Sequence, residues 1–113
     1  MADDLTLELE LGQLTISRDA FAEIVAETAL GCYGVVGLSA GSRVGRLLRR
    51  EGVGIEGDGQ GLRIELHVVV EHGLNLAEVA STVRSRVQYT VEKLTGLTVG
   101  AVQIHVQGVR RTS

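Results

Sequence analysis

The sequence predicts an α+β fold of two layers, in which two main helices pack on one face of a mixed, largely antiparallel sheet. Several short segments alternate apolar and polar residues, which is the period of a half-buried strand. Two longer segments, 17–31 and 75–96, instead place apolar residues at helical spacing and carry capping residues at their ends. The order of elements is therefore strand, helix, strand, hairpin, helix and strand.

The first predicted strand contains four alternating leucines, is interrupted at Gly12 and resumes over residues 14–16. Ser17 is suited to cap the first helix because its hydroxyl can accept a backbone N–H, and Asp19 in the first turn interacts favourably with the helix dipole. Gly31 is expected to end this helix as its C′ residue. The leucines are Leu5, Leu7, Leu9 and Leu11, and the apolar stripe of the helix is Phe21, Ile24, Val25, Thr28 and Ala29.

The middle of the chain predicts three further extended segments. Residues 33–38 are short, β-branched and spaced by glycine, which indicates a strand or an extended loop. Residues 53–55 and 62–70 alternate on either side of the glycine-rich turn 57–61, which indicates a β-hairpin. The stretch 39–50 has no regular period and is interpreted as a short helix or a mobile loop.

The second helix is predicted to begin at Asn75, which forms a capping arrangement with Glu78, and to end at Gly96. Segment 99–109 then forms the last strand. A right-handed crossover through the helix places this strand parallel to 62–70, as its neighbour. The face of the sheet opposite the helices is expected to stay open to solvent. The helix is expected to bury Leu76, Val79, Ala80, Val83, Val87, Val91 and Leu94.

Length and composition favour one ordinary globular domain over residues 1–113, with its core at about 5–109. The net charge is −3 and aromatic residues make up only 3%, so the chain lacks the basic surplus and the stacking side chains that nucleic-acid binders use. A single cysteine excludes an internal disulfide, and no signal-peptide pattern is present, so a cytoplasmic location is expected. No phosphate loop, serine elbow or paired-carboxylate motif appears, so neither an enzyme nor a cofactor is expected.

Glycines and aliphatic residues also recur at positions that carry a family resemblance. The closing block 95–109, TGLTVGAVQIHVQGV, is its most specific part. The pattern resembles the alkaline shock protein 23 family, the envelope stress response family of Gram-positive bacteria. Two positions depart from it, since the family often has asparagine in place of Gln103 and glutamine in place of Arg84. The matching positions before the block are Gly12, Leu14, Ile16, Ser17, Ile24, Gly34, Val35, Gly37, Leu38, Gly52, Val53 and Gly73.

The resemblance implies a small cytoplasmic protein that serves cell-envelope homeostasis and is held at the membrane by a small anchoring protein. It attaches no activity and no cofactor to the chain. The matching positions are mostly glycines and aliphatic residues, so the resemblance predicts the fold better than any site. The expected function is that of a non-enzymatic protein-binding or scaffold protein of the envelope stress response. Its partners are expected to be other proteins, and an unprotected sheet edge would also allow homo-oligomers.

The candidate partner-binding residues form an arginine cluster. Guanidinium groups at this density suit an acidic protein surface, nucleic-acid phosphates or anionic lipid head groups. An RNA-binding module that uses the cluster is therefore the first alternative function, and a solvated helix face is the competing interpretation. The cluster consists of Arg43, Arg46, Arg49 and Arg50.

Two histidines provide the second alternative, a metal-binding domain. His67 and His105 fall on the polar side of two strands that are predicted to be neighbours, and Glu65 or Glu71 could add a carboxylate ligand. Structural zinc usually has four protein ligands, so two solvated histidines on an open sheet face are the expected state.

Cys32 follows the C-terminal end of the first helix, where the helix dipole raises the pKa of a thiol. We therefore expect a buried, structural cysteine and not a reactive one.

Overall fold

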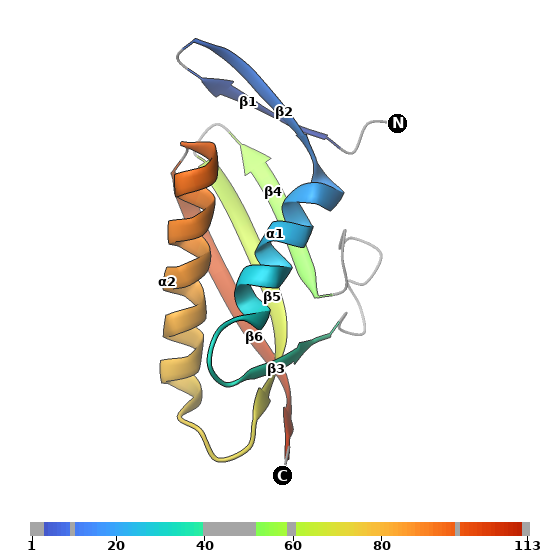
Figure 1. Ribbon diagram of the computed structural model, residues 1–113, viewed down its shortest axis with the longest axis vertical. Coiled ribbons are helices and arrows are strands. Elements are labelled where there is room, and N and C mark those ends of the chain that lie inside the picture. Colours follow the sequence, from blue (N-terminus) through green and yellow to red (C-terminus); the bar gives the residue numbers. More distant parts are fainter. Residues whose placement is uncertain (1–3, 10, 40–51, 59–60, 97, 112–113) are drawn as a thin grey trace.

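The computed structural model describes residues 4–9, 11–39, 52–58, 61–96 and 98–111 of the chain. Within these residues it forms six strands and two helices, and both helices lie on one face of the main sheet (Figure 1). This arrangement confirms the predicted α+β class. Of the irregular segment 39–50, only the first residue is described. Residues 40–50, which contain the arginine cluster, lie outside the described residues.

The main sheet is built around its central strand, β5 (Gly61–Glu71). On one side β6 (Val99–Arg110) runs parallel to β5 along almost its whole length. On the other side lie β4 (Val53–Asp58) and β3 (Val35–Leu38), both antiparallel to β5 and paired with different parts of it. The predicted hairpin and the predicted parallel last strand are therefore confirmed.

The N-terminal segment differs from its prediction. β1 (Asp4–Leu9) and β2 (Gly12–Ser17) form an antiparallel hairpin and a separate two-stranded sheet, in which Leu9 lies opposite Gly12. The expected single strand of the main sheet is therefore wrong. Alternation could not distinguish the two cases, because it has the same period in one long strand and in two strands joined by a two-residue turn. The hairpin reaches beyond the end of the main sheet (Figure 1).

Helix α1 (Arg18–Leu30) follows directly from this hairpin. The Ser17 hydroxyl accepts a hydrogen bond from the N–H of Ala20 at 3.0 Å, which confirms the predicted cap. The helix also ends at Gly31, but this residue does not take the left-handed conformation of a typical C′ glycine. Its φ is −81°, and its N–H donates to two carbonyls of the last turn, so the helix closes with right-handed backbone.

Helix α2 (Leu76–Thr95) has both of its predicted ends. The side-chain oxygen of Asn75 accepts from the N–H of Glu78 at 3.1 Å. Gly96 has a φ of 74° and donates its N–H to the carbonyl of Glu92, which is the left-handed end that glycine favours. Neither described helix is both long and apolar enough to cross a membrane.

The core lies between the helices and the main sheet. The predicted stripe of α2 is wrong at its two extremes, because Leu76 is 41% exposed and Leu94 is 59% exposed. These residues occupy the first and last turns of the helix, whereas the valines between them face the sheet. The buried apolar residues are Phe21, Ala22, Val25, Ala26, Ala29, Cys32, Val35, Val53, Ile55, Leu62, Ile64, Leu66, Val68, Val70, Val79, Val83, Val87, Val91 and Val99.

Candidate functional site

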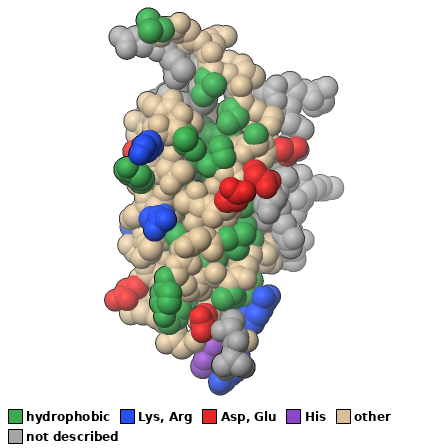
Figure 2. All heavy atoms as spheres, viewed as in Figure 1, with side chains coloured by type: hydrophobic (Ala, Val, Ile, Leu, Met, Phe, Trp, Pro, Cys, Tyr) green, Lys and Arg blue, Asp and Glu red, His purple; other side chains and the backbone are tan. Residues whose placement is uncertain are grey.

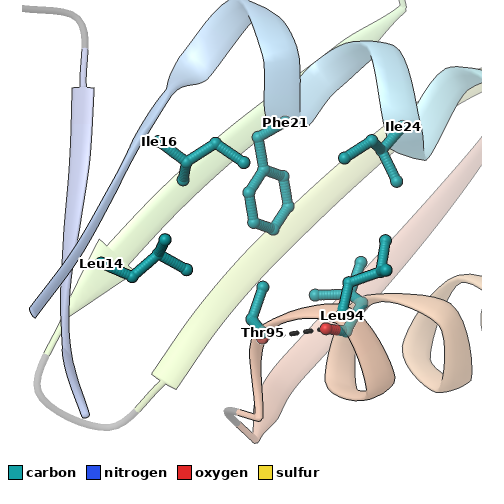
Figure 3. Close-up of a pocket in the computed structure, with 7 residues that line it drawn as sticks. Leu14, Ile16, Phe21, Ile24, Leu94 and Thr95 are labelled. Atoms are coloured by element: carbon teal, nitrogen blue, oxygen red, sulfur yellow. Dashed lines mark hydrogen bonds between the residues drawn. The ribbon is translucent and has the colours of Figure 1, made fainter. Parts of the chain in front are cut away.

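An apolar pocket of about 250 Å³ lies where the N-terminal hairpin meets both helices. In Figure 3 the labelled side chains of β2, α1 and α2 face one common space. The hydroxyl of Thr95 donates to the carbonyl of Val91 at 2.8 Å, so this polar group in the wall is already hydrogen-bonded. The lining residues are Leu14 and Ile16 from β2, Phe21 and Ile24 from α1, and Val91, Leu94 and Thr95 from α2.

This pocket is open to solvent. Leu94 in its wall is 59% exposed, and Leu11 at the turn of the hairpin is fully exposed. Figure 2 shows hydrophobic side chains at the surface of the same helix-bearing face. A concave apolar surface of this kind is typical of a site that receives an apolar group of a partner. Sequence patterns did not reveal the pocket, because they assigned Leu94 to the core and β2 to the main sheet.

A second surface follows the outer edge of β6. Among the described residues β6 pairs only with β5, so its other edge has no strand partner there. Natural edge strands are usually protected by charged residues or proline. From Val99 to Val109 this strand contains no proline, aspartate, glutamate, lysine or arginine. A groove of about 250 Å³ runs beside it and is lined by Ala77, Ala80, Ser81 and Arg84 of α2 and by Val102 and Ile104 of β6.

The two predicted histidines do come together. His67 of β5 lies opposite His105 of β6 in the parallel register, and their rings stack with centroids 4.6 Å apart and planes 11° from parallel. Glu65, two residues before His67 on the same sheet face, approaches both rings. The carboxylate of the group is thus Glu65, and Glu71 does not belong to it among the described residues.

The predicted solvation of these histidines is wrong for His67. Only 7% of His67 is exposed, and neither ring nitrogen has a hydrogen-bond partner among the described residues. Its backbone is held on the β3–β4 side of β5, where its N–H donates to the carbonyl of Gly52 and its carbonyl accepts from the N–H of Ser39. The sheet face opposite the helices is therefore not fully open. Sequence alternation identifies which face a residue occupies, but it does not show that the face is covered at that point.

Cys32 is buried, as predicted, and its thiol donates to the carbonyl of Thr28 at 3.4 Å. Burial raises the pKa of this thiol, and the positive charge of Arg86 lowers it to a smaller extent. The thiolate is the nucleophilic form, so this cysteine is suited to packing and not to catalysis. The predicted arginine cluster lies outside the described residues, so its binding role stays a prediction.

The chain is similar to known proteins over most of its length. The model of the alkaline shock protein 23 family, described by a cell envelope-related function, matches residues 6–111. The uncharacterized protein YloU of Bacillus subtilis (strain 168) is 34% identical, over 96% of this chain and 98% of that protein. The uncharacterized protein Spy1614 of Streptococcus pyogenes is 29% identical over 88% of each. A solved zinc form of the MamM CTD overlays with a TM-score of 0.49 at 15% identity, covering 84% of this chain and 86% of that one, which is too weak a likeness to indicate a function.

Proposed function

Because the chain belongs to the alkaline shock protein 23 family, which is described by a cell envelope-related function, we propose that it is a non-enzymatic protein-binding scaffold of the bacterial cell envelope. Membership of the family confirms the resemblance found in the sequence. The observation that supports a binding role is the open apolar pocket between β2, α1 and α2. A partner that carries its own membrane anchor would bring the chain to the membrane.

The pocket is proposed to receive apolar side chains of the partner protein. A cavity of about 150 Å³ is enough to hold a benzene molecule, so a pocket of about 250 Å³ has room for at least one large aliphatic side chain. The wall presents Leu14, Ile24 and Leu94, which offer dispersion contacts but no charge. The apolar lining therefore favours a leucine, isoleucine or phenylalanine anchor over a charged one.

Leu94→Glu is expected to reduce the recovery of the partner by more than about tenfold, because a carboxylate at the pocket wall would have to be desolvated on binding. Leu94 is already 59% exposed, so the change should leave the fold intact. The measurement is cross-linking in cells of a bacterium that carries the protein, followed by affinity purification and mass spectrometry.

The matched control is Tyr89→Glu, which adds the same charge to another exposed apolar residue of α2, 64% exposed and outside the pocket. This variant should recover the partner at the level of the unmodified protein. If Leu94→Glu and the unmodified protein recover the same proteins in the same amounts, the pocket is not the binding site.

The unprotected edge of β6 favours self-association as a second element of the scaffold. Two copies that pair β6 with β6 would continue the main sheet across the interface and place the small residues of α2 against each other. Ala80→Glu, in the groove beside this edge, should convert a dimer to a monomer in sedimentation velocity. Thr82→Glu, exposed and outside the groove, should remain dimeric. A monomer at every concentration of the unmodified protein would contradict this arrangement.

A further inference from the structure

We propose that Glu65, His67 and His105 bind a divalent transition-metal ion, and that Zn²⁺ is the ion this ligand set suits. The three residues project from β5 and β6 onto the sheet face opposite the helices, away from the apolar pocket. Each residue offers one ligand atom, a histidine nitrogen or a carboxylate oxygen, and these three atoms lie within 4.8 Å of one another. The site would add a metal-dependent property to the scaffold and does not depend on the proposed function.

The first argument is the state of His67. A neutral imidazole carries one N–H donor and one acceptor nitrogen, and burying either without a partner costs free energy. His67 is 7% exposed, and within the part of the chain that the structure describes both of its nitrogens are without a hydrogen-bond partner. The carboxylate of Glu65 is 3.7 Å from its Nε2 atom, which is too long for a hydrogen bond. A bound cation would take up the lone pair of the acceptor nitrogen and remove part of this cost.

The second argument is the spacing of the ligand atoms. With bonds of about 2.0–2.2 Å in tetrahedral geometry, two ligands of one zinc ion lie about 3.3–3.5 Å apart. The Nε2 atom of His105 lies 3.2 Å from one oxygen of Glu65, and the Nε2 atom of His67 lies 3.7 Å from the other. Both nitrogens therefore already face the same carboxylate at close to the separation that an ion between them requires.

The third argument is which parts of the site can move. The widest separation, 4.8 Å, must shorten before one ion can contact all three residues. His67 is buried and its backbone is hydrogen-bonded on the β3–β4 side of β5, so it acts as the fixed ligand. The side chains of His105 and Glu65 are 41% and 39% exposed and are hydrogen-bonded to each other, so the solvent side leaves room for them to turn towards it. Binding should consequently tilt the ring of His105 away from the stacked arrangement and towards the Nε2 atom of His67.

The chemistry of the ligands selects the ion. Imidazole suits zinc, copper, nickel and iron, whereas Mg²⁺ and Ca²⁺ prefer sites made of oxygen ligands. Two histidines and one glutamate form a three-ligand zinc set that leaves one coordination position open. Water or a side chain of a bound partner would complete the tetrahedron. The expectation of four protein ligands applies to closed structural zinc sites only.

The test is titration of the metal-free protein with Zn²⁺, followed by calorimetry and thermal unfolding. The unmodified protein should bind one ion per chain, and a Zn²⁺ concentration of about 100 times Kd should raise Tm by roughly 10 °C. Mg²⁺ at the same concentration should leave Tm unchanged. Co²⁺ should give the visible absorption of a four-coordinate ion without a thiolate charge-transfer band, since Cys32 is not a ligand.

His67→Gln and His105→Gln should each weaken Zn²⁺ binding on the order of 100-fold and abolish the rise in Tm. Glu65→Gln keeps the size of the side chain and leaves the two stacked histidine rings in place, and it removes only the negative charge. This variant therefore tests the site even if a histidine variant is unstable. The control is His72→Gln, which removes the third histidine of the chain at an exposed position outside the cluster and should bind Zn²⁺ as the unmodified protein does. Unmodified protein that binds no Zn²⁺, or cluster variants that bind as tightly as the His72→Gln control, would overturn the proposal and leave Glu65 and His105 as a hydrogen-bonded pair.

Discussion

Gly61→Ala is expected to lower the free energy of unfolding by about 3 kcal/mol or more, with no change in any apolar contact of the native protein. Gly61 begins β5 with a φ of +123°, a conformation that L side chains rarely adopt and that costs roughly 1–3 kcal/mol for another residue. A Cβ atom there would also lie 2.5 Å from the carbonyl oxygen of Thr98. That oxygen belongs to the backbone just before β6 and accepts a bond from Leu62, so it cannot move without disturbing the β5–β6 pair.

Gly73→Ala separates the cost of the backbone conformation from the cost of the close contact with the Thr98 carbonyl. Gly73 has a φ of +95°, but a Cβ atom added to it would meet no atom within 4 Å. Its substitution should therefore show the backbone strain alone, about 1–2 kcal/mol. The measurement is urea unfolding of both variants, with the slope of the transition as a check that the unfolded state is unchanged. Equal losses in the two variants would mean that the Thr98 carbonyl gives way to the added Cβ atom at no cost, so that the close approach of Thr98 to Gly61 does not restrict residue 61.

Much of this fold could be predicted from local signals because those signals have a direct physical cause. Ser17 and Asn75 cap their helices because their side-chain oxygens are at the right distance from a free backbone N–H. The parallel pairing of β6 with β5 follows from the handedness of the crossover through α2. These features depend on a few neighbouring residues or on chain chirality, both of which the sequence records.

The features that could not be predicted depend on contacts between distant segments. Leu14 and Ile16 alternate in the same way whether β2 joins the main sheet or folds back on β1, so the pocket beneath the hairpin leaves no periodic signal. The pairing of His67 with His105 was predictable from strand order, whereas the burial of His67 was not. Alternation records the direction of a side chain from the sheet, and burial depends on what covers that face.

Leu66→Ala is expected to lower the free energy of unfolding by about 3 kcal/mol. Leu66 is fully buried in the middle of β5, opposite Val53 of β4 on one side and Ile104 of β6 on the other. Hydrogen-bonded strands on both sides hold the backbone in place, so the surroundings cannot collapse into the cavity, and the lost contacts are not replaced.

The matched control is Leu94→Ala, the same truncation at a residue that is 59% exposed, which should cost less than about 1 kcal/mol. Thermal and urea unfolding of both variants measure the difference. If Leu94→Ala costs as much as Leu66→Ala, the pocket wall belongs to the core of the isolated chain, and the Leu94→Glu experiment would report unfolding in place of lost binding.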